Sequence, residues 1–416
     1  MKSYRWLFTL LVIPTLLLAA CSGTNLSSVT TSNVAAPVAV AGIAAPAVVL
    51  PQVTTPGDLA AFQSTLEEIY QKVNPSVVNV QVVEGSSAST SQSNNPFGRN
   101  PFGNNPGSQG PAQALGSGFV WDTQGHIITN NHLVDGSSKV QVTFSDGMTV
   151  DAKVVGTDPN ADLAVLQVNV PASQLAPVVL ADSTQVKVGQ IAIAIGNPFG
   201  LAGTMTEGII SGLERTLPVG LDNLTSQQGP TYSIPDIIQT DASINPGNSG
   251  GVLVDIQGQL IGVTAAIESS SGSNSGIGFV IPSAIVKKVV PSLIATGSYQ
   301  HPRIGISGTS MTPDLAKAMG FDSQQKGALV IEVTPGGPAA NAGLQASNQT
   351  ATINGQDVPV GGDVIVAING QSVKQFEDLS TYLFYNTSIG QTVNMTVLRN
   401  GKGQTVKVTL DALPNQ

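Results

Sequence analysis

A serine between glycines is the sharpest chemical signal in this sequence. Residues 245–251 have the sequence NPGNSGG and lie between two β-rich runs, at 237–241 and 252–254. Glycine tolerates the φ values of a tight turn, so the turn can expose the Ser249 hydroxyl while neighbouring backbone N–H groups converge on one point. Converging donors of this kind stabilise an oxyanion. The segment therefore predicts a nucleophilic serine beside an anion-binding turn, with a plain glycine-rich hairpin as the alternative.

A nucleophilic serine needs a base, and the sequence contains only three histidines. His301 stands beside Pro302 after the β-rich region, where we expect a linker. His126 follows a turn, and we expect its ring to face solvent. His132 follows the β-rich run 126–130, before a short turn, so its ring can face a cleft. His132 is the predicted general base, and a structural histidine is the alternative.

The third group must accept a hydrogen bond from the imidazole and hold its tautomer. Residues 158–166 have the sequence DPNADLAVL and offer two carboxylates. Asp158 precedes a proline and is typical of a turn. Asp162 opens an apolar strand, where a partly buried carboxylate is costly unless it is paired. Asp162 is therefore the predicted partner of His132, and the order His, Asp, Ser is that of chymotrypsin-type double barrels.

Short strands must hold these groups in place. The sequence favours strands bounded by turns in the first half of the chain, at 77–83, 116–121, 126–130, 139–144, 149–154 and 163–168. A second β unit runs from about 178 to 282, and strands of this length and spacing predict sandwiches or barrels. A helix is predicted from 282 to about 295, ended by Gly297. A third unit at 300–412 combines short strands with two helical stretches, near 312–319 and 375–386.

The N-terminus has the features of an export signal. A basic start is followed by an apolar run from 6 to 20 and by the only cysteine, Cys21, so no intrachain disulfide can form. The ending LAAC resembles a bacterial lipobox, which implies cleavage before Cys21 and lipidation of its thiol. An ordinary signal peptide or an uncleaved anchor is the alternative. Residues 1–21 are thus predicted to be a lipoprotein-type signal peptide, and 22–56 a flexible linker.

Composition narrows the class of protein. The net charge is −9, and charged residues make up only 10% of the chain, whereas it contains 45 glycines and 26 prolines. A diffuse acidic excess repels phosphate backbones, so no nucleic acid partner is expected. Abundant glycine and proline favour short strands joined by turns. Residues 85–113 are rich in Ser, Asn, Gly and Pro and predict a long mobile loop.

Four motifs in order resemble the HtrA (DegP- and DegS-like) serine proteases over about residues 60–412. They are TNNH at 129–132, DPNADLAVL at 158–166, IGNPFG at 195–200 and QTDASINPGNSGG at 239–251. The resemblance implies a mostly β fold, with a trypsin-like double β-barrel over 57–297 followed by a PDZ domain over 300–412. It implies a catalytic triad of His132, Asp162 and Ser249 and no cofactor, neither ATP nor metal. The implied oxyanion donors are the backbone N–H groups of Gly247, Asn248 and Ser249.

The resemblance also points to substrate-binding and regulatory segments. The S1 wall would consist of apolar residues, which favours small aliphatic P1 side chains, with core positions as the alternative; these residues are Ile244, Ala266 and Ile267. The PDZ loop that holds a peptide carboxylate would be Arg303, Ile304, Gly305 and Ile306. Regulatory loops would lie at 196–206, 217–233 and 268–275. Residues 345–361 are an insertion before Gly362 that could cap the PDZ groove or add a turn.

Together these features predict an extracytoplasmic protease, in the periplasm or at the cell surface, that is anchored to a membrane by lipid. It would cleave unfolded or damaged proteins and bind peptide C-termini. Two alternatives remain open, a peptide-binding holdase with an idle triad and a sensor that signals through one specific cleavage. The family commonly forms trimers through its N-terminal segment, so a homotrimer or higher oligomer is expected. Phe62, Ile69 and Tyr70 could then pack between protomers, or the helix that carries them could cover its own barrel.

Overall fold

The computed structural model describes residues 56–84, 113–198, 203–218, 233–245, 247–267 and 276–414. The signal segment 1–21 with Cys21, nearly all of the linker 22–56 and most of the loop 85–113 lie outside these residues. The predicted regulatory loop 268–275 lies outside them as well, as do parts of the other two. Among the helices within the described residues, none has the length and apolar character needed to span a membrane.

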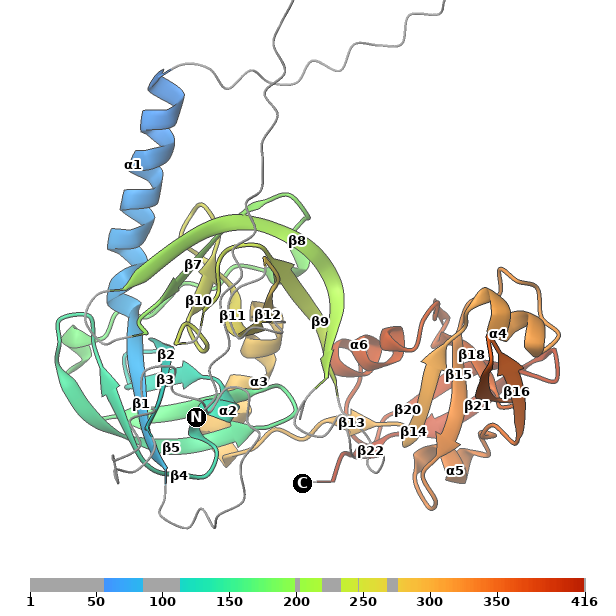
Figure 1. The fold of residues 1–416 in the computed structure, drawn as a ribbon. Coiled ribbons are helices and arrows are strands. Elements are labelled where there is room, and N and C mark those ends of the chain that lie inside the picture. The colour runs from blue at the N-terminus through green and yellow to red at the C-terminus, as the bar shows by residue number, and fades with distance from the viewer. Residues whose placement is uncertain are drawn as a thin grey trace, which may run out of the picture. The chain divides into compact units, whose positions relative to one another are not determined.

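The first six strands form a closed antiparallel barrel, in the order β1-β2-β3-β6-β5-β4 (Figure 1). The strands are β1 (Val77–Glu84), β2 (Gln113–Val120), β3 (His126–Thr129), β4 (Ser137–Thr143), β5 (Thr149–Asp158) and β6 (Leu163–Val168). Alternate residues of β1 point into the interior, where Val78, Val80 and Val82 pack with Leu166 of β6. This period of two is what the β-rich runs of the sequence predict.

The next six strands close a second barrel, in the order β10-β11-β12-β9-β8-β7. They are β7 (Ile191–Gly196), β8 (Thr204–Pro218), β9 (Ser233–Thr240), β10 (Val252–Val254), β11 (Leu260–Ile267) and β12 (Gly278–Pro282). Helix α3 (Ser283–Thr296) follows and buries Val286, Val289 and Leu293 in a core shared by both barrels. It ends at Gly297, whose φ of 82° provides the left-handed cap that the sequence predicts. The predicted double barrel is confirmed.

Helix α1 (Pro56–Val73) precedes the first barrel and is joined to it by the 3₁₀ turn Asn74–Ser76. Its last two turns cover the protease core, since Ile69 is only 4% exposed and the Tyr70 hydroxyl donates to the Gly203 carbonyl at 2.8 Å. At the other end Leu59 is 69% exposed. The C-terminal half of the helix therefore covers its own domain, and only the N-terminal half presents an apolar side chain to its surroundings.

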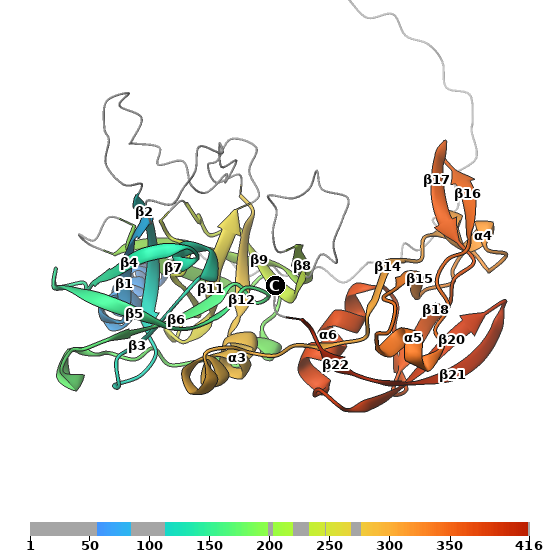
Figure 2. The same cartoon turned by 90° about the horizontal axis from the view of Figure 1, so that it is seen from below.

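The C-terminal unit is built on a sheet of order β14-β15-β18-β20-β21, with β19 paired to β18. Its elements are β13 (Pro302–Arg303), β14 (Ile306–Ser310), α4 (Pro313–Ala318), β15 (Ala328–Val333), α5 (Pro338–Ala342), β18 (Val364–Ile368), β19 (Gln371–Ser372), α6 (Glu377–Asn386), β20 (Thr392–Arg399), β21 (Lys402–Thr409) and β22 (Asp411–Ala412). The insertion forms a hairpin of β16 (Gln349–Ile353) and β17 (Gln356–Val360) (Figure 2). Ile353 and Val358 pack with Leu315 of α4, so the hairpin extends the unit on the α4 side.

Candidate active site

His132 lies on the one-turn helix α2 (Asn131–Val134), directly after β3, where the sequence predicts a turn. Its Nδ1 atom is 2.8 Å from Oδ2 and 3.0 Å from Oδ1 of Asp162. Its backbone N–H also donates to Asp162 Oδ1, at 2.9 Å. A carboxylate that accepts from both the ring and the backbone of one histidine fixes the ring orientation and keeps a proton on Nδ1. The neutral ring then has Nε2 as its acceptor nitrogen.

Asp162 is held in an unusual backbone conformation just before β6. Its φ is 50°, in the left-handed region that costs energy for a residue with a Cβ. Two neighbours keep it there: the Asn130 side-chain amide donates to the Asp162 carbonyl at 3.0 Å, and Asp158 Oδ1 accepts from the Asn160 and Ala161 N–H groups. Asn130 is fully buried. The sequence analysis did not single out this role of Asn130, although Asn130 belongs to the TNNH motif.

The pKa of His132 is raised above its usual value of 6.5. Burial is the largest influence and lowers the pKa, because it disfavours the charged imidazolium. The negative charge of Asp162 and its hydrogen bond to the ring raise the pKa, and together they outweigh the burial. The site is therefore built to accept a proton on His132.

Ser249 lies in the turn between β9 and β10, at the place where this turn meets the first barrel. The Ser117 N–H of β2 donates to the Ser249 carbonyl at 2.8 Å. Gly250 has a φ of 82°, and a Cβ on it would lie 2.1 Å from the Ser117 carbonyl oxygen and 2.6 Å from Thr129 Oγ1. Only glycine fits this position. The serine is thus fixed against β2 and against the end of β3, three residues before His132.

The structure corrects one of the three predicted oxyanion donors. The Asn248 N–H donates to the Asn245 carbonyl at 2.9 Å and closes the turn, so this N–H is not directed at a substrate oxygen. Within the described part of the chain, neither the Gly247 N–H nor the Ser249 N–H donates to a backbone carbonyl. Gly247 has a φ of 93°, and a Cβ there would lie 2.5 Å from the Pro198 side chain. The pair of donors that remains is Gly247 and Ser249.

The other two histidines do not lie where the sequence suggests. His126 is not solvent-facing: its side chain is 13% exposed and its Nδ1 lies 2.6 Å from Asp122 Oδ2. His301 is not a plain linker residue: its side chain is 2% exposed, and its Nε2 lies 2.8 Å from Asp158 Oδ2. Asp158 forms the predicted turn but is also the buried partner of His301. The His301–Asp158 pair was missed because its residues are 143 positions apart in the chain. The His126–Asp122 pair is local, four residues apart, and the sequence analysis overlooked it.

Replacing His301 by alanine is expected to lower the free energy of unfolding by about 3–5 kcal/mol, because it leaves the buried Asp158 carboxylate without its partner. Urea unfolding of the two proteins measures the difference. Lys139→Ala is the matched control, because its pair with Asp151 is exposed and should contribute far less to the free energy of unfolding than the buried pair. If His301→Ala costs as much in an Asp158→Asn background as in the wild type, the two side chains are not coupled and the expectation fails.

The structure places the predicted substrate-binding residues in different environments. Ile244 is 1% exposed and packs in the core of the second barrel, so it does not form an accessible pocket wall in this conformation. Ala266 and Ile267 lie on β11, but their side chains are outside the described part of the structure. In the C-terminal unit, Ile304 and Gly305 connect β13 to β14, and their carbonyls accept from the Ala339 and Thr334 N–H groups.

The arginine of the predicted carboxylate loop already has a partner. The Arg303 guanidinium bonds both carboxylate oxygens of Asp411, at 3.0 and 3.4 Å. Ile306 begins β14, a strand at the edge of its sheet. A peptide carboxylate would therefore depend on the backbone N–H groups of this loop and not on the Arg303 charge.

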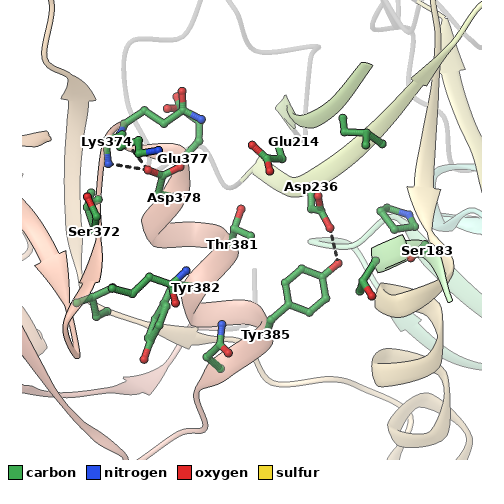
Figure 3. A pocket seen from close by; sticks show the side chains of 18 of the residues that line it. Ser183, Glu214, Asp236, Ser372, Lys374, Glu377, Asp378, Thr381, Tyr382 and Tyr385 are labelled. Carbon is green, nitrogen blue, oxygen red and sulfur yellow. Dashed lines mark hydrogen bonds between the residues drawn. The ribbon is translucent and has the colours of Figure 1, made fainter. Parts of the chain in front are cut away.

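A cavity of about 620 Å³ lies between the second barrel and α6, away from the triad (Figure 3). The Tyr385 hydroxyl of α6 donates to Asp236 Oδ2 of β9 at 2.9 Å. Burial raises the pKa of Asp236, the Tyr385 hydrogen bond lowers it, and the charge of Glu214 raises it further, so that the net shift is upward. None of His132, Asp162 and Ser249 lines this cavity. It is a contact region between α6 and the protease barrels.

Two family models match the chain, "Trypsin-like peptidase domain" over residues 116–263 and "PDZ domain" over residues 302–410. The chain is 37% identical over 359 residues to the periplasmic pH-dependent serine endoprotease DegQ of Escherichia coli. The match covers 86% of this chain and 72% of DegQ. The chain is 42% identical over 305 residues to the chloroplastic Protease Do-like 1 of Arabidopsis thaliana. This match covers 73% of this chain and 65% of that protein. The chain spans 53% of a DegP-like protease of Brucella suis, so several curated relatives are considerably longer.

Solved structures of HtrA-type proteases are similar to this chain as well. The HtrA-type protease AlgW with a decapeptide matches with a TM-score of 0.62 at 32% identity, covering 84% of this chain and 99% of AlgW. A serine endoprotease from Yersinia pestis matches with a TM-score of 0.54 at 28% identity, covering 84% of this chain and 98% of that one. With the double barrel, the PDZ unit and the four motifs in their places, the chain belongs to the HtrA (DegP/DegQ-like) family of trypsin-like serine endoproteases with a PDZ domain.

Proposed function

We propose that this protein is a serine endopeptidase of the extracytoplasmic space that cleaves unfolded or damaged proteins. The observation that carries the proposal is the pairing of His132 with Asp162 next to the Ser249 turn. A histidine held by a carboxylate through both its ring and its backbone is arranged as a general base. The glycines on both sides of the serine let its turn pack closely against Pro198 and β2, where any side chain would clash.

The reaction would proceed through an acyl-enzyme. His132 Nε2 takes the proton from the Ser249 hydroxyl while Oγ attacks the scissile carbonyl carbon. The carbonyl oxygen becomes an oxyanion, which the Gly247 and Ser249 N–H groups stabilise. Asp162 stabilises the imidazolium without taking its proton. His132 then protonates the leaving amine, the C–N bond breaks, and water hydrolyses the ester by the reverse sequence of proton transfers.

The PDZ unit would bind substrate or regulatory peptides by their C-termini. In the described sheet, β14 pairs with β15 on one side, so its other edge can accept an added peptide strand. The solved AlgW structures that resemble this chain contain a tripeptide or a decapeptide. We propose that the PDZ unit of this chain binds peptides by strand addition, and that the protease site prefers small aliphatic residues at P1.

The location and assembly follow from the N-terminal segment and from the relatives. Curated relatives are named as periplasmic, and the LAAC sequence ending at Cys21 favours a lipid-anchored protein. A homotrimer or higher oligomer would use the N-terminal half of α1, where Leu59 is 69% exposed. Burying such a side chain against a second copy stabilises the assembly by the hydrophobic effect.

A fluorophosphonate probe tests the proposed function. It should label the protein once per active site, and mass spectrometry of the digested adduct should place the phosphonate on Ser249, because only a serine with an activated hydroxyl reacts quickly. Unfolded casein should be hydrolysed by the same preparation, and prior labelling should stop the hydrolysis. A folded protein that binds casein without labelling and without cleavage would instead be a holdase, and the proposal would be wrong.

A further inference from the structure

One fully buried serine outside the triad is hydrogen-bonded both to the turn that carries Ser249 and to the strand that precedes His132. Ser117 lies on β2 with no exposed surface. Its Oγ donates to the Gly247 carbonyl at 2.6 Å and accepts from the Asn197 N–H at 2.8 Å. A buried hydroxyl that is satisfied as both donor and acceptor has a single orientation, since turning it would break both bonds. The sequence marks Ser117 only as part of a strand.

The Gly247 carbonyl matters because of the peptide unit to which it belongs. This peptide joins Gly247 to Asn248, and so lies between the two N–H groups that would stabilise an oxyanion, those of Gly247 and Ser249. Ser117 holds its C=O on one side, while its N–H donates to the Asn245 carbonyl on the other. With both ends bonded, the peptide plane cannot rotate. The direction of the two flanking N–H groups is then set.

The backbone of Ser117 makes two further hydrogen bonds, one to each barrel's part of the site. Its N–H donates to the Ser249 carbonyl at 2.8 Å, and its own carbonyl accepts from Thr129 Oγ1 at 2.7 Å. Thr129 is the last residue of β3, directly before the segment that carries His132. Ser117 thus connects the nucleophile turn of the second barrel to the histidine side of the first barrel.

We propose that Ser117 is a positioning residue that preorganises the oxyanion donors by holding the peptide plane between Gly247 and Asn248. The inference rests on the proposed function and deepens it. Oxyanion donors that already point in the right direction need not reorganise as charge develops on the substrate oxygen. This preorganisation is the main source of the catalytic effect of an oxyanion hole. The hydroxyl of Ser117 is expected to act on the transition state and to leave substrate binding unchanged.

Ser117→Ala tests the proposal in the full-length protein. We expect kcat for a peptide substrate to fall by about ten- to a hundredfold with KM unchanged, which is below the loss of about a hundred- to a thousandfold typical when one oxyanion donor is removed outright. The inhibition constant of a peptide aldehyde, whose hemiacetal oxygen would occupy the same hole, should rise by the same factor as kcat falls. Ser283→Ala is the matched control, since its buried hydroxyl donates to the Ala181 carbonyl at 2.7 Å in the second barrel.

Several outcomes would overturn the proposal. A Ser117→Ala protein within about twofold of wild type in kcat would do so, as would an equal loss in the Ser283→Ala protein. If the alanine variant does not fold, Ser117→Cys preserves the volume with a weaker donor, and its kcat should lie between those of wild type and a deficient hole. A Cys variant with full activity would again contradict the role of the hydroxyl. An inactive wild type that no fluorophosphonate labels would instead contradict the proposed function.

Discussion

Replacing Ser249 by alanine is expected to lower kcat for peptide hydrolysis by about a millionfold, the loss seen when the nucleophile of a serine protease is removed. The reason is that His132 and Asp162 act only through the Ser249 hydroxyl, so without it their proton transfer has no substrate. Affinity for unfolded protein should stay the same. Hydrolysis of labelled casein, followed over days at high protein concentration, measures the remaining rate.

Two comparisons make this result specific. Ser138→Ala removes an exposed hydroxyl on β4 that donates to the Val83 carbonyl of β1 and not to the triad, and this variant should retain the wild-type rate. Urea unfolding should show that the Ser249→Ala protein is folded, because the substitution removes one hydroxyl and leaves the backbone hydrogen bond from Ser117 to Ser249 in place. A Ser249→Ala protein that still cleaves casein at the wild-type rate would place the nucleophile elsewhere.

Replacing Asp162 by asparagine is expected to lower kcat by about ten thousandfold with the fold intact. In the wild-type protein, the Asp162 carboxylate accepts hydrogen bonds from both the His132 backbone N–H and the ring Nδ1–H. An amide has only one oxygen, so its NH₂ group would face Nδ1 and favour the tautomer with the proton on Nε2. That tautomer cannot take the proton of Ser249, and the ring loses its function as a base.

The pH dependence should change as well, in a direction that the His132 pKa sets. Only the neutral ring is a base, so wild-type kcat/KM should fall as the pH drops through the raised pKa, above 6.5. The Asp162 charge and hydrogen bond raise that pKa, so the remaining activity of Asp162→Asn should have its acid limb at lower pH. Asp122→Asn is the control, since it disrupts the other His–Asp pair of this barrel, at His126. An unchanged acid limb in Asp162→Asn would contradict the electrostatic role of Asp162.

Much of the protease fold could be predicted from local patterns. Strand β6 coincides with the predicted run 163–168, and α3 ends at Gly297 as expected, because alternation and glycine caps are determined by neighbouring residues. The pairing of His132 with Asp162 was predictable for a different reason: a partly buried carboxylate needs a partner, and few histidines are available. Both inferences rely on rules that hold without knowing which segments meet.

Where segments distant in the chain meet, the sequence was a poorer guide. His301 and Asp158 are 143 positions apart, and nothing near either residue indicates their contact. Asn248 was predicted to donate to an oxyanion, but its N–H closes a turn onto Asn245, which depends on turn geometry. Ile244 was assigned to a pocket wall by resemblance, and the packing of the second barrel buries it. In these three cases the outcome depends on which side chains the fold buries and on how distant segments are aligned. Neither can be read from one segment of the sequence.

The buried pair of His301 and Asp158 has a consequence for the recombination of protein domains during evolution. The boundary predicted between the protease and PDZ domains falls at about residue 297, before His301. Yet the side chain that pairs with Asp158, in the turn before Asp162, comes from beyond this boundary. A peptidase module transferred by recombination at that point would arrive without this histidine. Compatible exchange would therefore require the breakpoint to lie after His301, so that the peptidase and the first residues of its neighbour are inherited as one segment.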